Sequence, residues 1–455
     1  MTTEYAGARV LVAGLGISGS AVARALLDRG ADVVAVDAGA GGRLEQVATE
    51  LRAAGAEVRL GDATTAVDAD LVVTSPGWRP DQPMLVDAAR RGIEVIGEPE
   101  LAWRLRPPGA ADWLGVTGTN GKTTTVGMLA SILTAGGLHT VAAGNVGLPL
   151  IDAVLATPAY DVLAVELSSF QLHWSSSLQC SAACVLNVAD DHRDWHGSAA
   201  AYAEDKARIL RGDVLAVVNL DDVGSIRASA WSTRRIGFTL GEPAPGEYGV
   251  HGEDLIDADG SVLAAVGDVV VPGRHNVGNA LAAAALARTR SVARSAVRSG
   301  LQAYAPGPHR NEVVAVGGGV RWVDDSKATN PHAAAASLSA YENVVWIAGG
   351  LLKGTDVDEL VAGQSHRLKA VVLIGQDRGE IAAALARHAP DVPVVTIDTE
   401  DTEGMDEAVR AAAALAAPGD TVLLAPAAAS MDMFQDYAER GERFATAARH
   451  AAGAR

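Results

Sequence analysis

The stretch VLVAGLGISGSAVARALLDRGADVVAVD, from Val10 to Asp37, determines the fold class of the first part of the chain. An apolar run leads into the glycine-rich turn GLGISG, a helical pattern follows, and a second apolar run ends at Asp37. The turn fits the G-x-G-x-x-G pattern that brings a diphosphate to a helix N-terminus, and an acidic residue in this place holds the ribose in nicotinamide enzymes. The stretch therefore predicts a parallel α/β sheet and raises the hypothesis of a nicotinamide-dependent oxidoreductase.

The whole chain is long and acidic. At about 150 residues per domain, its 455 residues predict three domains. The net charge of −18 argues against nucleic-acid binding, because proteins that bind phosphate backbones need a basic surface. The first residues lack the apolar region of a signal peptide, and no apolar run reaches the roughly 20 residues that span a bilayer. We therefore expect a cytoplasmic protein without membrane insertion.

The two cysteines, Cys180 and Cys184, fall in one strand-like run, CSAACVLNV. Side chains four apart on a strand share a face but lie too far apart to bridge easily. Without a cluster of histidines or further cysteines nearby, the pair is weak support for a metal site. We expect both to be small buried hydrophobic residues in a reducing compartment.

Strand and helix patterns alternate along the chain, which predicts parallel sheets. Proline-bearing breaks at Arg104–Asp112 and Tyr304–Arg310 divide the pattern into three. We predict an α/β fold with a Rossmann-like domain over residues 1–106, a central P-loop mononucleotide-binding domain over 107–306 and a C-terminal Rossmann-like domain over 307–455. The first domain is expected to have strands at Arg9–Ala13, Asp32–Val36, Glu57–Leu60 and Leu71–Thr74.

The motif GTNGKTT, Gly118–Thr124, follows an apolar strand and opens a helix. Its glycines let backbone N–H groups turn toward an anion, Lys122 can reach the β- and γ-phosphates, and the Thr123 hydroxyl can bind Mg²⁺. The strict phosphate-loop pattern has glycine where this chain has Val116, so the loop is a variant. An ordinary glycine-rich turn is the alternative, but a Gly-Lys-Thr in this context favours a phosphate site.

Further polar residues follow predicted strands, where ligands of parallel sheets bind. Glu166 ends the strand of LAVELSSFQL and is equally well explained as a Mg²⁺ ligand or a structural carboxylate. His192, in the acidic loop ADDHRDWHG, is a candidate metal ligand, whereas we interpret His196 only as a solvated loop residue. Lys206 lies on a predicted helix, and from the residues alone we expect it to be solvated.

The C-terminal part contains the densest group of polar side chains, VDDSKATNPHA, at Val323–Ala333. So many charges and donors at a strand end favour a ligand site over a long capped turn, by roughly two to one. Asn276 and Asn279 begin a helix and are explained equally well as caps. The strand ends GGLLKG and LLAPAAASMDMF offer Lys353 and Ser430, each weak support alone.

In order along the chain, nine motifs together resemble the Mur ligase family. The motifs are SPG at Ser75–Gly77, GTNGKTT, GNVG at Gly144–Gly147, ELSSFQL, DDHRD, HNVGNALAA, HRNE at His309–Glu312, DDSKATNP and APAAASMDMF. They extend over all three predicted domains. SSFQL and DSKATN resemble the members that add D-glutamate rather than the sister ligases or the folylpolyglutamate synthases.

The resemblance implies an ATP-dependent carboxylate–amine ligase of peptidoglycan precursor synthesis. It would use ATP and Mg²⁺ to join D-glutamate to UDP-N-acetylmuramoyl-L-alanine (UDP-MurNAc-L-Ala) through an acyl phosphate, with domain closure around the substrates. It also implies a carbamylated Lys206. A monomer is expected, and no partner beyond these small molecules is implied.

The resemblance also implies roles for individual residues. Catalysis would involve Lys122, His192 and Lys206. The metal ligands would be Thr123, Glu166, His192 and Lys206. ATP would be bound by Gly118, Thr119, Asn120, Gly121, Lys122, Thr123, Thr124, Asn279, Arg310, Asp325 and Lys327. The UDP-substrate would be bound by Gly14, Gly16, Ser18, Gly19, Asp37, Ser75, Pro76, Gly77 and Asn145. D-Glutamate would be bound by Thr329, Lys353, Ser430 and Tyr437.

Some positions depart from the family, and two other functional classes remain alternatives. Tyr437 stands where phenylalanine is common, and Asp37 is followed by AGAGG rather than by the threonine and basic residue that some relatives use near uracil. A nicotinamide oxidoreductase explains Asp37 and the first glycine-rich turn but none of the later motifs. A nucleotide-gated binding module predicts ATP binding without turnover that depends on an amino acid.

Overall fold

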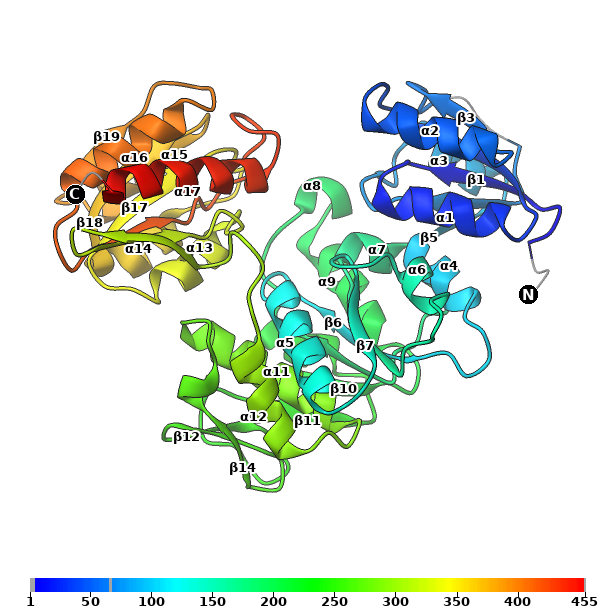
Figure 1. Ribbon diagram of the computed structural model, residues 1–455, viewed down its shortest axis with the longest axis horizontal. Helices are drawn as coiled ribbons and strands as arrows, with labels where there is room; N and C mark the ends of the chain where they lie inside the picture. Colours follow the sequence, from blue (N-terminus) through cyan, green and yellow to red (C-terminus); the bar gives the residue numbers. More distant parts are fainter. Residues whose placement is uncertain (1–4, 65–67, 454–455) are drawn as a thin grey trace. The chain divides into compact units, whose positions relative to one another are not determined.

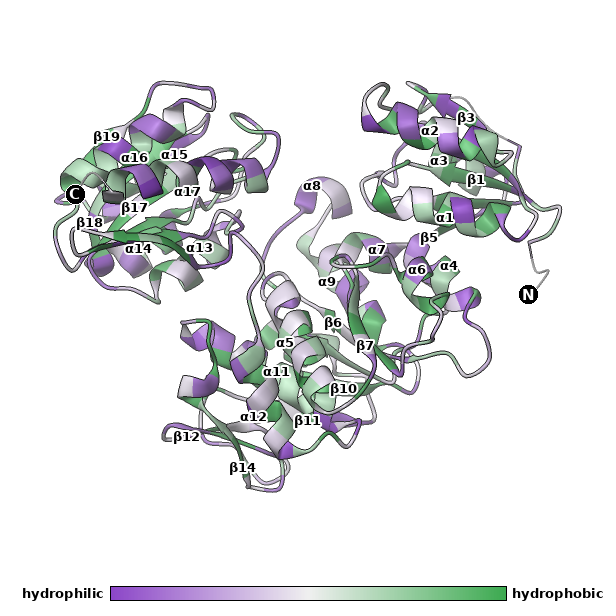
Figure 2. Ribbon diagram, viewed as in Figure 1, coloured by the Kyte–Doolittle hydropathy of each residue, from purple (hydrophilic) through white to green (hydrophobic). Residues whose placement is uncertain are grey.

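The computed structural model describes residues 5–64 and 68–453 and contains four β-sheets in that part of the chain (Figure 1). The chain divides into two compact units, one of Met1–Asp268 with Gly278–Tyr304, the other of Val269–Val277 with Ala305–Arg455. Figure 2 shows hydrophobic residues concentrated on the strands, while the helices also carry hydrophilic ones. The chain is therefore an α/β protein, as predicted. The predicted boundaries after residues 106 and 306 remain predictions.

The first sheet has the order β3-β2-β1-β4-β5, and all of its strand pairs are parallel. The strands are β1 (Arg9–Ala13), β2 (Asp32–Asp37), β3 (Glu57–Leu60), β4 (Leu71–Thr74) and β5 (Glu94–Gly97), and the helices are α1 (Ile17–Leu27), α2 (Arg43–Ala53), α3 (Pro83–Arg90) and α4 (Glu98–Arg104). The four predicted strands are confirmed, and only β2 is longer, by one residue. Parallel strands covered by helices are buried, which explains why they read as continuous apolar runs.

The second sheet, in the order β11-β10-β9-β6-β8-β7, is also parallel. Its strands are β6 (Asp112–Thr117), β7 (Thr140–Gly144), β8 (Val162–Glu166), β9 (Ala182–Val185), β10 (Leu215–Asn219) and β11 (Arg235–Phe238). Its helices are α5 (Lys122–Ala135), α6 (Leu150–Val154), α7 (Ser169–His173), α8 (Arg193–His196), α9 (Ala199–Ala207), α10 (Val223–Ala228), α11 (Arg274–Arg288) and α12 (Arg294–Ala303). Between β11 and α11 the chain forms a small antiparallel sheet of β12 (Gly249–His251), β13 (Asp254–Ile256) and β14 (Val262–Ala265).

Strand β9 differs from the prediction that one run would contain both cysteines. Cys184 lies in β9, but Cys180 precedes the strand. Both thiols are free and buried, as expected, and burial raises the pKa of Cys180 to about 12. We expected the strand to continue to Val188, but it ends at Val185, and beyond it the Asn187 carbonyl accepts from Thr119 N, in the loop after β6, at 3.0 Å.

The fourth sheet belongs to the second unit and has the order β15-β16-β20-β17-β18-β19. The strands are β15 (Glu312–Gly317), β16 (Val320–Asp324), β17 (Val344–Gly349), β18 (Leu368–Ile374), β19 (Val394–Thr396) and β20 (Thr421–Leu424). The helices are α13 (Pro331–Leu338), α14 (Asp358–Gln364), α15 (Arg378–His388), α16 (Gly404–Leu415) and α17 (Tyr437–Gly453). The expected strand–helix alternation is confirmed, and the edge strand β15 is antiparallel to β16.

No helix among the described residues is long and apolar enough to cross a membrane.

Candidate nucleotide and metal site

The loop between β6 and α5 has the backbone that a phosphate loop requires. Gly121 precedes α5 with a φ of 85°, in the left-handed region that favours glycine. A Cβ on Gly121 would lie 2.5 Å from the Oδ1 atom of Asn279, a residue of α11. The structure thus brings together two residues that we predicted to bind ATP, and a side chain on Gly121 would displace the Asn279 side chain from this position.

Two lysines donate hydrogen bonds to a single carbonyl of this loop. The Nζ atoms of Lys122 and Lys206 each lie 2.8 Å from Gly118 O, and Lys122 Nζ also lies 2.9 Å from Thr119 O. Lys206 is only 2% exposed, so the prediction that it is solvated is wrong. Burial, and then the charge of Lys122, lower the pKa of Lys206 well below its ordinary value. This environment favours a neutral Lys206 amine beside the phosphate loop.

Two residues that we did not predict hold the loop in place. Asn187 accepts from the Asn120 backbone N–H at 2.9 Å through its side chain and donates back to Asn120 O at 3.1 Å. The hydroxyls of Thr119 and Tyr202 lie 3.1 Å apart. Asn187 lies two residues past the end of β9, so its place at the carboxyl end of a strand was a usable signal. The burial of Tyr202 depends on how α9 packs, and the residue pattern carries no comparable signal for it.

Glu166 ends β8 at the same edge of the sheet and is 1% exposed. Its Oε1 atom accepts from Asn145 Nδ2 at 2.8 Å, and its backbone carbonyl accepts from Asn145 N at 2.9 Å. Its Oε2 atom is buried and has no hydrogen-bond partner among the described residues. A buried oxygen without a partner is costly, so this carboxylate fits a cation site. Asn145, which we predicted to contact the UDP-substrate, contacts Glu166 in this structure.

The two histidines of the acidic loop have different environments. His192 precedes α8 with a φ of 52°, and its side chain is 38% exposed, with Nε2 3.5 Å from Asp191 Oδ2. His196, at the end of α8, has a fully buried side chain. Its Nδ1 atom lies 2.9 Å from Asp205 Oδ2 and its Nε2 atom 3.0 Å from Ser169 Oγ. The interpretation of His196 as a solvated loop residue is therefore wrong.

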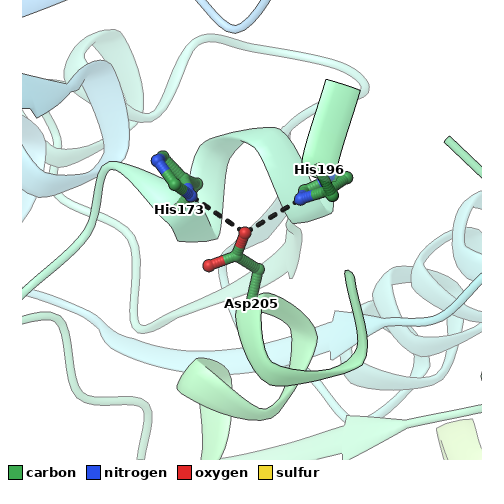
Figure 3. Close-up of side chains that lie close together, drawn as sticks. All are labelled: His173, His196 and Asp205. Atoms are coloured by element: carbon green, nitrogen blue, oxygen red, sulfur yellow. Dashed lines mark hydrogen bonds and ion pairs between the residues drawn. The ribbon is translucent and has the colours of Figure 1, made fainter. Parts of the chain in front are cut away.

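Asp205 joins His196 to a third residue, His173, whose Nδ1 atom also lies 2.9 Å from Asp205 Oδ2 (Figure 3). Burial raises the pKa of the Asp205 carboxyl, but the hydrogen bonds from the two histidines outweigh this effect and lower it to about 2. We predicted neither His173 nor Asp205 as functional. They are brought together by the packing of α7 against α9, which local sequence patterns do not reveal.

Apart from Asn145, the predicted UDP-substrate residues lie at the carboxyl ends of β1, β2 and β4. Gly14 has a φ of 96°, and a Cβ on Gly19 would lie 1.8 Å from Gly14 O, so the turn requires both glycines. Ser75 Oγ donates to Gly14 O at 3.1 Å. Asp37 accepts from Leu15 N at 2.7 Å and from Gly39 N at 2.8 Å. Its observed contacts stabilise the two turns. Of the other predicted residues here, Gly77 is exposed and Ser18 and Pro76 are half-buried.

In the second unit, the predicted residues surround the end of β16. Lys327 Nζ lies 3.6 Å from the centre of the Tyr437 ring, and the neighbouring Ser326 hydroxyl donates to Tyr437 O at 2.7 Å. Burial raises the pKa of Asp325 to about 6. Next to it, Asp324 Oδ2 lies 2.7 Å from Nδ1 of His309, a buried residue that neighbours the predicted Arg310.

A buried arginine that we did not predict connects the loops of this unit. Arg440, on α17, has no exposed surface and donates to the Ser326 carbonyl at 2.9 Å and to the Ala428 carbonyl at 3.1 Å. Two further hydrogen bonds of 2.9 Å join the backbones of Leu351 and Ala429. These contacts connect the segments of Lys327 and Thr329, of Lys353, and of Ser430, the last of which is 4% exposed. Arg440 lies inside an amphipathic helix pattern, so its burial could not be read from the chain.

Three regions of the chain match domains of one family. Residues 8–97 match the MurD-like N-terminal domain of Mur ligases, residues 116–287 the Mur ligase middle domain, and residues 309–428 the Mur ligase glutamate ligase domain. The chain belongs to the Mur ligase family and has the three-domain architecture of that family. The resemblance inferred from the motifs is confirmed, and the nicotinamide hypothesis has no support beyond the first glycine-rich turn.

Comparison with individual proteins identifies relatives from the same family. The chain is 55% identical to the UDP-N-acetylmuramoylalanine--D-glutamate ligase of Streptomyces avermitilis, with 98% of this chain and 99% of that protein covered. It is 57% identical to the protein of the same name from Frankia casuarinae, with 98% and 95% covered. The crystal structure of the UDP-N-acetylmuramate-alanine ligase MurC from Thermotoga maritima shares the fold, with a TM-score of 0.62, 19% identity and coverage of 96% and 98%.

Proposed function

We propose that this chain is an ATP-dependent ligase that joins D-glutamate to UDP-MurNAc-L-Ala, a step of cytoplasmic peptidoglycan precursor synthesis. The observation that carries the proposal is the convergence of Lys122, Lys206 and Glu166 at a glycine-rich phosphate loop. Relatives that are 55% and 57% identical to this chain over nearly their full length carry the name of this activity.

The proposed reaction activates a carboxylate that otherwise resists attack by an amine. A carboxylate oxygen of UDP-MurNAc-L-Ala attacks the γ-phosphorus of ATP, and ADP leaves with the electrons of the broken P–O bond. The D-glutamate amine then attacks the acyl carbon, the amide forms, and phosphate and a proton leave. The chain's own residues position the reactants and balance their negative charge. Lys122 is the residue that we assign to the γ-phosphate.

The donor set around the loop fits Mg²⁺, which prefers oxygen ligands. The buried Glu166 Oε2 atom, without a partner among the described residues, supports this assignment. We propose Thr123, Glu166, His192 and a carbamylated Lys206 as the residues that hold Mg²⁺. When bound, the metal would neutralise phosphate charge. A carbamate on Lys206 also fits its environment, because a neutral buried amine reacts with carbon dioxide and becomes an anion that can bind a cation.

The remaining predicted residues keep their roles as proposals. The turn of Gly14–Gly19, with Asp37, Ser75–Gly77 and Asn145, would hold the UDP-substrate. Lys327 and Asp325 would contact ATP together with Asn279 and Arg310. Thr329, Lys353, Ser430 and Tyr437 would bind the D-glutamate carboxylates. We propose that the enzyme acts as a monomer, with domain boundaries after residues 106 and 306.

The proposed function is tested by measuring phosphate release in reactions that each lack one component. We expect turnover only when UDP-MurNAc-L-Ala, ATP, Mg²⁺ and D-glutamate are all present. Equal turnover with L-lysine or meso-diaminopimelate in place of D-glutamate would assign the chain to a sister activity. ATP binding without turnover that depends on an amino acid would instead support the binding module.

A further inference from the structure

The Asp205 carboxylate accepts hydrogen bonds from two histidines and forms an ion pair with one arginine. Its Oδ2 atom lies 2.9 Å from Nδ1 of His173 and 2.9 Å from Nδ1 of His196 (Figure 3). Its Oδ1 atom lies 2.9 Å from Nε of Arg208. Arg208 also donates to the His173 carbonyl at 2.7 Å. Asp205 is 4% exposed, so its carboxylate is largely shielded from solvent, which strengthens its hydrogen bonds. We call His173, His196, Asp205 and Arg208 the Asp205 cluster.

The Asp205 cluster connects the three segments that carry the proposed metal ligands. Asp205 directly precedes Lys206 on α9. His196 ends α8, the helix that begins immediately after His192. His173 ends α7, which follows the strand that ends at Glu166. A second hydrogen bond within this network, between His196 Nε2 and Ser169 Oγ, joins α8 to the start of α7. A single buried carboxylate therefore links the backbones on which Glu166, His192 and Lys206 depend.

The geometry favours a hydrogen-bonded cluster over a metal site of its own. Both imidazole nitrogens lie at hydrogen-bond distance from the same oxygen, whereas ligands of Zn²⁺ surround the metal at about 2.0–2.2 Å. The Arg208 guanidinium already balances the Asp205 charge, and it would repel a cation bound to that carboxylate. Packing supports the same reading, because the Phe170 ring stacks on His196 with 5.4 Å between ring centres.

We propose that the Asp205 cluster positions α8 and α9 so that His192 and Lys206 hold their places at the phosphate loop. Its members touch no reacting group and act through Lys206, His192 and Glu166, so Asp205, His173 and His196 are positioning residues. The proposal rests on the ligase function proposed above. Misplacement of catalytic groups by about 1 Å costs about 100-fold in rate, so disrupting the cluster reduces turnover far more than substrate binding.

The first test is Asp205→Asn, with Glu204→Gln as a matched control. The change to asparagine keeps the size of the side chain but removes the charge and one acceptor oxygen, while Glu204 is an exposed acidic residue on the same helix. We expect Asp205→Asn to lower kcat about 100-fold and to change each KM less than about threefold. Glu204→Gln should match the wild type. A kcat for Asp205→Asn within threefold of the control, or a loss confined to KM, would overturn the proposal.

The second test uses His173, whose side chain is 29% exposed and can be replaced with little risk to folding. His173→Ala removes one donor, whereas His173→Asn keeps an N–H close to the place of Nδ1. We expect His173→Ala to lower kcat about tenfold and His173→Asn to restore most of it. Equal losses in the two variants would show that volume, and not the hydrogen bond, matters, and would contradict the proposal.

Two measurements are independent of ligase turnover. Hydrogen exchange should be faster in residues 192–207 of Asp205→Asn than in the wild type and unchanged in β6 and β8, and unchanged exchange in residues 192–207 would overturn the proposal. In a zinc titration, the untagged wild type and His173→Ala should bind zinc equally. A zinc site that is present in the wild type and lost in His173→Ala would make the cluster a metal centre and overturn the proposal. If the wild type releases no phosphate with the four components, the ligase proposal fails, while hydrogen exchange still decides the positioning role.

Discussion

Lys206 combines two properties that a lysine rarely has, namely a buried side chain and a second ammonium group close by. Its amine shares the Gly118 carbonyl with Lys122, and its pKa is lowered well below the ordinary value, first by burial and then by that charge. Removing water from an ammonium disfavours its charge. The same low pKa that would make Lys206 a poor cation makes it a good candidate for modification by carbon dioxide.

The first prediction concerns this side chain. Lys206→Ala should lower kcat at least about 100-fold, because the anion that we propose at this position is lost. A short carboxylate such as acetate should restore part of the activity by occupying the vacated space. Lys206→Met fills that space with a side chain of similar length and should show no rescue. The measurement is phosphate release over a range of acetate concentrations, and full activity of Lys206→Ala would contradict the role.

The second prediction concerns Glu166. Glu166→Gln retains the Oε1 atom that accepts from Asn145 and replaces the Oε2 oxygen, which has no partner among the described residues, by a neutral amide. We expect the Mg²⁺ concentration for half-maximal activity to rise about tenfold or more, because an amide is a weaker ligand for Mg²⁺ than a carboxylate. Phosphate release measured against Mg²⁺ concentration tests this. An unchanged Mg²⁺ dependence would remove Glu166 from the metal site.

At the residue scale, the sequence predicted the position of a residue only when that residue lies next to a strand or at the start of a helix. Glu166, Lys122 and His192 follow strands or open helices, so their position at a sheet edge could be predicted from strand patterns alone. His196, Asp205 and Arg440 gain their environments from helices that pack against each other. Their burial is a tertiary property, and no local pattern distinguishes them from solvated residues.

The phosphate loop shows how an element constrains a residue. Gly121 precedes α5 with a φ of 85°, and Gly137 lies just past the C-terminus of the same helix with a φ of 81°. A Cβ on Gly121 would meet Asn279 at 2.5 Å, whereas a Cβ on Gly137 would have nothing within 4 Å. The two glycines share a left-handed backbone conformation that favours glycine, and they differ in the space around them.

The third prediction uses this pair. Gly121→Ala should lower ligase turnover at least about 100-fold, because the added Cβ displaces either the loop or the Asn279 side chain from its place and adds strain at a positive φ. Gly137→Ala should cost about 1 kcal/mol of stability and leave turnover within about threefold of the wild type. The comparison is made by phosphate release and thermal unfolding of both variants. Similar turnover of the two variants would show that the close contact between Gly121 and Asn279 does not affect catalysis.

Helix α4 connects the first two sheets through a buried acid. Glu98 is 1% exposed and accepts from Ile151 N, at the start of α6, at 2.8 Å. Its other oxygen is buried without a hydrogen-bond partner among the described residues. Burial raises the pKa of Glu98 from 4.5 to about 7, an effect that the hydrogen bond to Ile151 only partly offsets. Between pH 4.5 and about 7, the Glu98 carboxyl therefore keeps its proton in the folded state and loses it in the unfolded chain.

The fourth prediction follows from the sign of this shift. The stabilising contribution of Glu98 is complete below pH 4.5 and is lost as the pH rises through about 7, because only the folded state keeps the proton in between. The lost contribution is about 3 kcal/mol. Glu98→Gln cannot titrate, so the difference in Tm between variant and wild type should favour the variant more at pH 8 than at pH 5. An equal difference at both pH values would contradict the raised pKa.

At the scale of the whole molecule, the chain's repeated strand–helix alternation predicted the three-domain class but not how the apolar cores divide. One large cluster of buried residues includes Val10, in β1, and Val218, in β10, so the first two sheets share a core. The two clusters of the fourth sheet draw their described members from residues 314–452 alone. Side-chain burial decides this grouping, and strand patterns carry no information about it.

The fifth prediction is that residues 305–455 fold on their own. Their core includes the fully buried Trp322 and Trp346 and contains a complete six-stranded sheet, which is enough for a domain of about 150 residues to unfold cooperatively. The isolated segment should show one thermal transition with native-like near-UV dichroism from these tryptophans, and no phosphate release, since the phosphate loop lies in the other unit. The segment 1–106, whose core is shared with the second sheet, is the matched control and should be much less stable. A stable 1–106 together with an unfolded 305–455 would show that the core clusters do not mark the units that fold, and would move the predicted boundary at residue 306.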